Sequence, residues 1–399
     1  MWQKMKNFYH FLVALLANIY YRFPSKKLLL IGITGTDGKT TTANLIYQIL
    51  KAAGKKVSLI TSVNAQIGER KFDTGFHVTT PEPQKIPQYL RLAVQEGSKY
   101  FVMEATSHGL DQNRLAFCSF KIGVLTNITH EHLDYHQTYG QYLRAKARLF
   151  KKVKWAILNR EDQSFEKIKH FINPSKTKIV TYGIKVGDFT IKKFPFTTPL
   201  PGEYNQHNCL AAVACCRTLG ISAETIKKVL KEVKPIIGRL EKIDYSQDFQ
   251  VFIDFAHTPN ALKNVLSYLK TILPPSGRLI AVFGSAGLRD QTKRPKMGEI
   301  AARLADIIVL TAEDPRTEDV NQIINQIAEG SKSQKAKIYK VPDRQEAISF
   351  AVQKLAQKGD IVVIAGKGHE RSMNFGKIEY PWSDQQAVKK ALEKLKKER

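Results

Sequence analysis

Cysteine is scarce in this sequence. Only four of its 399 residues are cysteines, namely Cys118, Cys209, Cys215 and Cys216, and no two of them form a CxxC pair. This usage indicates a reducing, cytoplasmic environment and argues against a structural zinc site.

Acidic residues are also few. The chain has 36 Asp and Glu against 62 Lys and Arg, a formal net charge of +26. Such an excess favours anionic ligands such as nucleotides, or a negatively charged membrane face. Lysine is spread along the whole chain, however, and no long basic stripe interleaved with aromatic residues occurs. We therefore expect a solvated basic surface and no nucleic-acid partner.

The N-terminal region has no apolar run long enough to cross a bilayer. The stretch Phe8–Tyr21 is apolar, but it is too short to span a membrane and has no small-residue cleavage site after it. Arg22 and a turn containing Pro24 end it. We expect residues 1–24 to form an apolar helix packed on the next domain, in preference to a helix lying in a membrane interface.

The stretch from Leu28 to Thr42, LLLIGITGTDGKTTT, carries the strongest local signal. An apolar run typical of a buried parallel strand is followed by a glycine-containing loop and a helical pattern over Thr41–Ala53. Such a loop presents backbone N–H groups to a polyphosphate, while Lys39 reaches the β- and γ-phosphates and Thr40 binds Mg²⁺. Ile33 holds the place of the first Walker A glycine. The stretch predicts a nucleoside triphosphate site.

Polar residues follow several further predicted strands. Tyr100–Glu104 ends in a carboxylate, and Ile122–Ile128 is followed by the histidine-rich segment 129–136. The carboxyl ends of parallel strands form the crevice in which α/β proteins bind ligands. Further strands are expected at Val57–Thr61, Trp155–Leu158 and Lys178–Tyr182. Helices are expected at Tyr139–Phe150 and Cys209–Leu219.

The pattern resets near Pro235, and a second series of alternating strands and helices follows. Its regularity predicts a doubly wound, Rossmann-like sheet in the second domain. The first domain is predicted to be a P-loop-type ATPase domain with a mostly parallel sheet. We place the domains at residues 25–238 and 239–399. The strands expected in the second domain are Val251–Phe255, Leu279–Phe283, Ile307–Leu310, Ile338–Val341 and Ile361–Ala365.

Eleven short motifs, in order from the phosphate loop to the C-terminal region, resemble those of the Mur ligase family, in particular its members that add the third residue of the muramyl peptide. They are GTDGKTTT (35–42), TTPEP (79–83), MEATSHGLDQNR (103–114), TNITHEHLDYH (126–136), YLRAKARLF (142–150), GEYNQHN (202–208), GRLE (238–241), DFAHTPN (254–260), RDQTKRP (289–295), EDPRTED (313–319) and AGKGHE (365–370).

The resemblance implies a role for each matching residue. Catalysis would involve Lys39, Glu104, His132 and Lys146, and two Mg²⁺ ions would be held by Thr40, Glu104, His132 and Lys146, the last as a CO₂-derived carbamate. ATP would contact Gly35, Thr36, Asp37, Gly38, Lys39, Thr40, Thr41, Asn205, Asn208, Arg239, Asp254 and His257. The muramyl-peptide acceptor would contact Thr79, Thr80, Thr106, Gln112 and Arg114. The incoming amino acid would contact Arg289, Asp314, Pro315, Arg316, Gly366 and Glu370.

The implied reaction is ATP-dependent amide formation in peptidoglycan precursor synthesis. ATP phosphorylates a substrate carboxylate, and the amine of a free diamino acid attacks the resulting acyl phosphate. Arg316 matches an arginine that grips the second carboxylate of diaminopimelate in the family, so we expect meso-diaminopimelate in preference to L-lysine. We expect a monomeric enzyme.

Some positions depart from the family pattern. Asp37 replaces an Asn, Leu288 replaces a polar residue, and Asp314 replaces the Asn of a DNPR-type motif. We also expect no uridine-binding N-terminal domain, whose place residues 1–27 would take. These departures leave a lipid-linked muramyl peptide open as the acceptor.

Two other interpretations remain open at this point. A folylpolyglutamate or poly-γ-glutamate synthase would share the phosphate loop and the carbamylated lysine, although AGKGHE and EDPRTED favour the muramyl peptide. A non-enzymatic scaffold is disfavoured, because the catalytic side chains are all retained.

Overall fold

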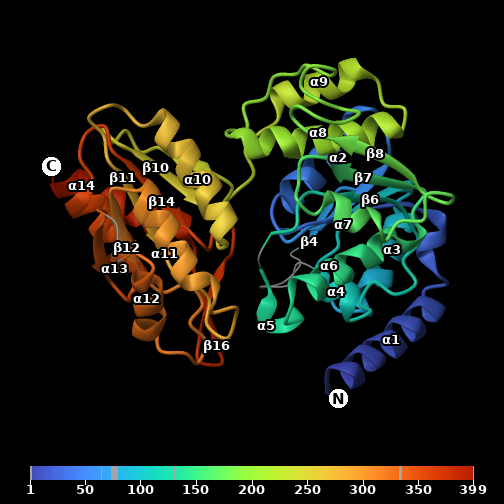
Figure 1. Ribbon diagram of the computed structural model, residues 1–399, viewed down its shortest axis with the longest axis horizontal. Helices are drawn as coiled ribbons and strands as arrows, with labels where there is room; N and C mark the ends of the chain where they lie inside the picture. The colour runs from blue at the N-terminus through green and yellow to red at the C-terminus, as the bar shows by residue number, and fades with distance from the viewer. Residues whose placement is uncertain (1, 64, 73–79, 130, 332–334, 399) are drawn as a thin grey trace. The chain divides into compact units, whose positions relative to one another are not determined.

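A computed structural model describes residues 2–63, 65–72, 80–129, 131–331 and 335–398 (Figure 1). The chain forms two compact units. The first contains residues up to Thr129 together with His136–Lys234, and the second contains Pro235–Arg399. The described part of His130–Tyr135 groups with the second unit, although it lies between two segments of the first in sequence.

The first unit is built on an eight-stranded sheet in the order β4-β3-β2-β5-β1-β6-β7-β8. The pairs from β2 to β8 are parallel, and only the β2–β3 and β3–β4 pairs are antiparallel. The mostly parallel sheet is confirmed. The strands are β1 (Leu29–Thr34), β2 (Val57–Ile60), β3 (Ala65–Ile67), β4 (Arg70–Phe72), β5 (Tyr100–Glu104), β6 (Phe120–Leu125), β7 (Trp155–Asn159) and β8 (Lys178–Tyr182).

Helices cover both faces of this sheet, as expected for strands that are apolar on both sides. One core contains residues of α2, α8 and α9, and the other contains residues of α3, α4, α6 and α7. The helices of the unit are α1 (Trp2–Tyr20), η1 (Pro24–Lys27), α2 (Lys39–Ala52), α3 (Lys85–Gln95), α4 (Ser107–Asp111), α6 (Tyr139–Ala147), η2 (Arg148–Lys152), α7 (Phe165–Lys169), α8 (Glu203–Thr218) and α9 (Ala223–Glu232).

The second unit has a six-stranded sheet in the order β13-β12-β11-β14-β10-β9, in which only β9 is antiparallel to its neighbour. The doubly wound arrangement is confirmed, because α10, α11 and α12 pack on one face and α13, η3 and α14 on the other. Its strands are β9 (Glu241–Ile243), β10 (Gln250–Asp254), β11 (Leu279–Phe283), β12 (Ile307–Leu310), β13 (Lys337–Lys340), β14 (Ile361–Ala365), β15 (Ser372–Phe375) and β16 (Ile378–Pro381). Its helices are α10 (Pro259–Ile272), α11 (Lys293–Leu304), α12 (Val320–Glu329), α13 (Arg344–Phe350), η3 (Ala351–Leu355) and α14 (Asp384–Glu398). The first three residues of α5 (Leu133–His136) also group with this unit, whereas His136 groups with the first.

Several expected boundaries were wrong. The strand expected at Ile122–Ile128 is β6, which ends at Leu125, because the next two residues turn to bond the phosphate loop. The helix expected at Tyr139–Phe150 ends at Ala147 and tightens into a 3₁₀ turn. Helix α8 begins at Glu203, six residues before the expected start, after Gly202 adopts a φ of 82°.

Three antiparallel additions were missed altogether. The β3–β4 and β15–β16 hairpins and the edge strand β9 have only three or four residues per strand. Strands of that length are too short for an alternating pattern to stand out from the surrounding loops.

Helix α1 packs on the first unit, as expected. Asn7 Nδ2 donates to Asp111 O at 3.1 Å, and Asn113 Nδ2 donates to Asn7 O at 3.2 Å. The ring centroids of Phe11 and Phe117 lie 5.2 Å apart. No helix in the described part of the chain combines the length and the apolar character needed to cross a bilayer.

Candidate active site

The loop between β1 and α2 has the geometry of a phosphate-binding turn. Gly38 is the N-cap of α2 and has a φ of 81°, and a Cβ there would lie 2.2 Å from Asn208 Oδ1. Glycine is therefore required at this position by both backbone conformation and space. Lys39 folds back along the loop, where its Nζ donates to Gly35 O at 3.1 Å and Thr36 O at 2.8 Å. The first amides of α2 and a lysine ammonium thus lie at one turn, as an anion site requires.

Three oxygen-bearing side chains meet beside this loop. Thr40 Oγ1 donates to Glu104 Oε1 at 2.8 Å and lies 3.0 Å from Ser62 Oγ. The Ser62 backbone N–H also donates to Glu104 Oε1, at 3.0 Å. Glu104 is buried at the end of β5, which is paired with β1. A carboxylate and two hydroxyls are hard oxygen donors of the kind that Mg²⁺ prefers. Ser62 was not expected here.

Lys146 comes from α6 and is almost completely buried, with a relative exposure of 1%. Its Nζ donates to Gly35 O at 2.6 Å and lies 4.4 Å from the centroid of the Tyr142 ring. The structure therefore places this lysine against the phosphate loop, and excludes its being an ordinary lysine on a helix surface.

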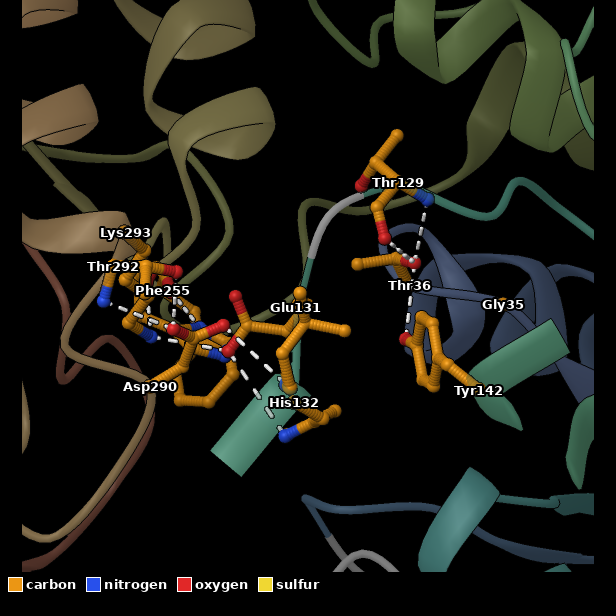
Figure 2. A network of polar contacts seen from close by, with 12 residues as sticks. Gly35, Thr36, Thr129, Glu131, His132, Tyr142, Phe255, Asp290, Thr292 and Lys293 are labelled. Carbon is orange, nitrogen blue, oxygen red and sulfur yellow. Dashed lines mark hydrogen bonds and ion pairs between the residues drawn. The ribbon is translucent and has the colours of Figure 1, made fainter. Parts of the chain in front are cut away.

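The loop is held from behind by the segment after β6. Asn127 Oδ1 accepts from Asp37 N at 3.0 Å, while Thr126 Oγ1 donates to Asp37 O at 2.6 Å. Thr36 Oγ1 accepts from Thr129 N at 2.9 Å and lies 3.1 Å from the Tyr142 hydroxyl (Figure 2). Backbone and side-chain hydrogen bonds thus hold the loop in this conformation.

Asn205 and Asn208 come from the first turns of α8, and α8 packs on α2. Asn208 Nδ2 donates to Asn205 Oδ1 at 3.0 Å, and Asn208 Oδ1 accepts from Thr42 Oγ1 at 3.4 Å. Since Asn208 also approaches Gly38, the structure brings this expected nucleotide-contacting pair to the phosphate loop. Thr41 is buried in the first turn of α2.

A second polar cluster lies where β5 leads into α4. Thr80 and Thr106 hydroxyls lie 2.8 Å apart, and Thr106 Oγ1 caps α4 by accepting from Gly109 N. Arg114 donates from Nη1 to Thr80 O at 3.2 Å and from Nε to Gln112 Oε1 at 2.9 Å. Four of the five residues expected to contact the acceptor are thus linked by hydrogen bonds: Thr80, Thr106, Gln112 and Arg114. Thr79, the fifth, lies outside the described residues.

In the second unit, Asp254 holds the loop that carries Arg239. Its two carboxylate oxygens accept from Leu240 N at 2.6 Å and Ala256 N at 2.7 Å. The Arg239 guanidinium lies over the Phe255 ring, 4.5 Å from its centroid. These bonds make Asp254 a positioning residue for the backbone around Arg239.

His257 is next to the same loop. Its Nδ1 pairs with Phe255 O at 2.9 Å, and its own carbonyl accepts from Lys293 Nζ at 2.8 Å. Burial, reinforced by the charge of Lys293, lowers the pKa of His257 to about 3. His257 is therefore a neutral imidazole at physiological pH.

Lys293 is buried and also donates to Glu131 Oε1 at 3.1 Å (Figure 2). Leu133 N donates to Asp290 Oδ2 at 3.3 Å. These bonds explain why the described residues of 131–135 group with the second unit. His132 adopts a φ of 58°, and its Nδ1 lies 4.0 Å from Glu131 Oε1. Its expected role as a metal ligand with Glu104, a residue of the first unit, stays a prediction.

Two of the residues expected to contact the incoming amino acid, Asp314 and Glu370, lie around one lysine of the second unit. Lys367 is fully buried, and its Nζ lies 2.8 Å from Asp314 Oδ1 and 2.5 Å from Glu370 Oε2. Burial alone would lower the pKa of Lys367, but the carboxylates of Glu370 and Asp314 raise it above its usual value. Lys367 thus compensates the charge of the Asp314 carboxylate.

Arg316 follows Pro315 and adopts a φ of 53°. Its backbone N–H donates to Asn374 O at 3.0 Å, so the β15–β16 hairpin fixes its position. Its Nη1 donates to Gly287 O at 2.5 Å. Burial and the nearby charge of Arg289 lower the pKa of Arg316. The carboxylates of Asp314, Glu313 and Glu370 act on the same pKa in the opposite direction, so Arg316 lies among charges of both signs.

Models of two domains match the chain: the Mur ligase middle domain over residues 33–216, and the Mur ligase glutamate ligase domain over residues 238–368. The sequence is 37% identical over 404 residues to UDP-N-acetylmuramoyl-L-alanyl-D-glutamate--2,6-diaminopimelate ligase of Caldanaerobacter subterraneus subsp. tengcongensis. That alignment covers 96% of this chain and 82% of the relative. The chain belongs to the Mur ligase family.

Solved structures agree with the family. A structure of a UDP-N-acetylmuramoyl-L-alanyl-D-glutamate--2,6-diaminopimelate ligase has a TM-score of 0.60 and 31% identity, over 92% of this chain and 78% of that one. Mycobacterium tuberculosis folylpolyglutamate synthase has a TM-score of 0.71 over 89% of this chain and 92% of that one, but only 16% identity, which shows the fold alone. As a Mur ligase, the chain is an ATP-dependent ligase that joins an acid to an amino acid.

In this Mur ligase the residues expected to contact the incoming amino acid have two buried charged neighbours that were not predicted from the sequence, Lys367 and Glu313. Glu313 is buried, and its Oε2 has no hydrogen-bond partner among the described residues. A Cβ on Gly366 would lie 2.8 Å from the same oxygen, and Gly366 has a φ of 110°. Gly366 therefore leaves room for the Glu313 carboxyl. Burial raises the pKa of Glu313 to about 7.

This shift predicts a pH-dependent stability. Between about pH 4.5 and 7 the folded chain binds more protons at Glu313 than the unfolded chain, so stability falls as pH rises through this window. Glu313→Gln should remove that dependence. As pH rises from 4.5 to 8, the unfolding free energy of the variant minus that of the native chain should increase by on the order of 2–4 kcal/mol. Urea titrations at each pH measure both free energies. Glu329→Gln, at an exposed position of α12, is the control. Parallel pH profiles for the native chain and Glu313→Gln would contradict the assignment.

Proposed function

We propose that this Mur ligase adds meso-diaminopimelate to the D-glutamyl carboxyl of UDP-N-acetylmuramoyl-L-alanyl-D-glutamate, in peptidoglycan precursor synthesis. The relatives named for that reaction support the assignment, at 37% identity over most of the chain. The observation that carries the choice of amino acid is Arg316, which is fixed by its bonds to Asn374 O and Gly287 O and lies near the charge of Arg289. Meso-diaminopimelate brings a second carboxylate, which L-lysine lacks, and a guanidinium recognises carboxylates in two-point geometry.

The first unit would carry out the phosphorylation of the acceptor. The phosphate loop and Lys39 hold the ATP phosphates, and Asn205 and Asn208 lie close enough to the loop to contact the nucleotide. Thr80, Thr106, Gln112 and Arg114 offer donors and acceptors to the muramyl peptide. The acceptor carboxylate attacks the γ-phosphate, which yields ADP and an acyl phosphate. Placing both reactants in one orientation supplies much of the rate enhancement.

Mg²⁺ fits the oxygen cluster beside the loop, with Thr40 and Glu104 as ligands. When bound, it neutralises charge on the phosphates during transfer. A carbamate at Lys146 would add an anionic oxygen next to the loop, where the uncarbamylated lysine places a cation. The expected second ion, with Glu104 and His132, is part of this proposal.

The second unit would supply the amine. Arg289 and Arg316 would bind the distal carboxylate, next to the charged cluster of Lys367, Asp314 and Glu370. The free amine attacks the acyl phosphate, and collapse of the tetrahedral intermediate releases phosphate and forms the amide. Arg239, Asp254 and His257 would support the nucleotide from this unit.

ADP release measured against a matrix of acceptors and amino acids tests the proposal. We expect release only when a muramyl dipeptide and meso-diaminopimelate are present together. Acceptors with and without the uridine nucleotide, and a folyl acceptor with glutamate, complete the matrix. A Lys39→Ala variant controls for contaminating ATPase activity. Release with the folyl acceptor, and none with muramyl dipeptides, would overturn the proposal.

A further inference from the structure

Helix α1 has two unlike faces. One face packs on the first unit, where His10, Ala14 and Asn18 are buried and Asn7 bonds the backbone of Asp111. Figure 1 shows α1 as a single long helix at the rim of that unit. A surface helix usually turns its apolar side to the protein and its polar side to solvent. In α1 the polar side chains Asn7, His10 and Asn18 lie on the inner face instead.

The outer face is apolar along its whole length. Phe8, Leu16 and Tyr20 have relative exposures of 62%, 66% and 78%. Their helical spacing places them on one side, opposite the buried residues. Large contiguous apolar surfaces on soluble proteins mark interaction sites. The other exposed members of this face are Met5, Tyr9, Leu12 and Ile19.

Only basic residues accompany this face. The first 36 residues contain no Asp or Glu. Lys4 and Lys6 are exposed, and helical spacing puts them on opposite borders of the apolar face. Arg22 and Lys26 follow the helix and are exposed as well. Within residues 1–36, the charged residues that border the apolar face are thus all basic.

We propose that α1 docks this enzyme on an anionic lipid surface, with the helix lying along the membrane plane. The apolar face enters the boundary between headgroups and acyl chains, and the bordering lysines contact anionic headgroups. Tyr9 and Tyr20 are aromatic residues with a polar tip, which favour the headgroup level. Helix α1 lies on the surface without crossing it, consistent with its length and composition.

Charge distinguishes this partner from a second copy of the chain. Two α1 helices packed face to face would bring their lysines together, on chains that each carry a net charge of +26. An anionic surface instead neutralises those charges, at a gain of roughly fivefold in binding for each basic residue near the membrane.

Vesicle flotation of the full chain tests the proposal. We expect the native chain to float with vesicles of phosphatidylcholine and phosphatidylglycerol at low salt, and to remain at the bottom with phosphatidylcholine alone. The triple variant Phe8→Ser, Leu12→Ser, Leu16→Ser should no longer float. Replacing Lys4 and Lys6 with glutamine should weaken binding roughly 10- to 30-fold.

A matched control replaces exposed apolar residues elsewhere on the first unit, Phe171→Ser and Val186→Ser, and should float like the native chain. Circular dichroism and thermal melting establish that every variant is folded. Failure of the native chain to float at low salt overturns the proposal, as does flotation that the triple variant retains. A dimer in light scattering that the triple variant converts to monomer assigns the face to a second copy and also overturns it.

Discussion

Lys146→Ala should lower the rate of ADP release on the order of 10²- to 10³-fold, the cost of removing an electrostatic group that acts on the transferring phosphate. The physical reason is the position of Lys146, buried and 2.6 Å from the Gly35 carbonyl of the phosphate loop. An ammonium there would oppose Mg²⁺, whereas a carbamate supplies an anionic oxygen ligand. Acetate or formate should partly restore turnover of the alanine variant, because each replaces the lost carboxylate.

Two further measurements separate a carbamate from a plain lysine. Carbon-13 NMR after equilibration with labelled bicarbonate should show one carbamate signal in the native chain and none in Lys146→Ala. Lys151→Ala, at an exposed position of the following turn, should keep native turnover and the signal. If Lys146→Ala turns over normally in CO₂-depleted buffer while folded, the carbamate assignment is wrong.

Arg316→Ala should remove the preference for meso-diaminopimelate over L-lysine. Loss of a buried charged contact costs about 2–5 kcal/mol, which corresponds to roughly 30- to several-thousand-fold in kcat/KM. That loss should fall on meso-diaminopimelate, since L-lysine has no second carboxylate for the guanidinium to bind. Competition between the two amino acids for ADP-coupled ligation, analysed by mass, measures the selectivity directly.

Three further variants make the test of Arg316 more specific. Arg316→Lys should recover only part of the selectivity, because an ammonium cannot make the two parallel hydrogen bonds of a guanidinium. Arg303→Ala, at an exposed position of α11, is the matched arginine control. Asp314→Asn should affect selectivity less than Arg316→Ala, because Lys367 already compensates the Asp314 carboxylate. Equal efficiency of the native enzyme with both amino acids would refute the role of Arg316.

The phosphate loop could be predicted from the sequence. A buried strand, a glycine with positive φ and a helix beginning at Lys39 lie within fifteen residues, so their geometry follows from neighbouring residues alone. The parallel sheets were predictable for a similar reason, since strands buried on both faces form short apolar runs. Eleven ordered motifs then indicated the family, which the comparisons confirmed.

Contacts between residues far apart in the sequence could not be predicted in this way. Ser62 joins Thr40 and Glu104, and Asn127 holds Asp37, although each comes from a different strand end. Nothing in the local sequence around Lys367 shows that it will be paired with Asp314, 53 residues away. The energy of a buried polar group depends on which partners the fold brings to it, and sequence spacing does not contain that information.

The sequence by itself therefore determined the family, the two sheets, the phosphate loop and the apolar character of the N-terminal helix. Only the tertiary structure decided which face of α1 is buried, because periodicity places residues on a face without saying what covers it. It also decided that the Glu313 carboxyl is buried and that Lys146 lies against Gly35. Burial and pairing are properties of the packed chain, and they set the charge state on which the proposed chemistry depends.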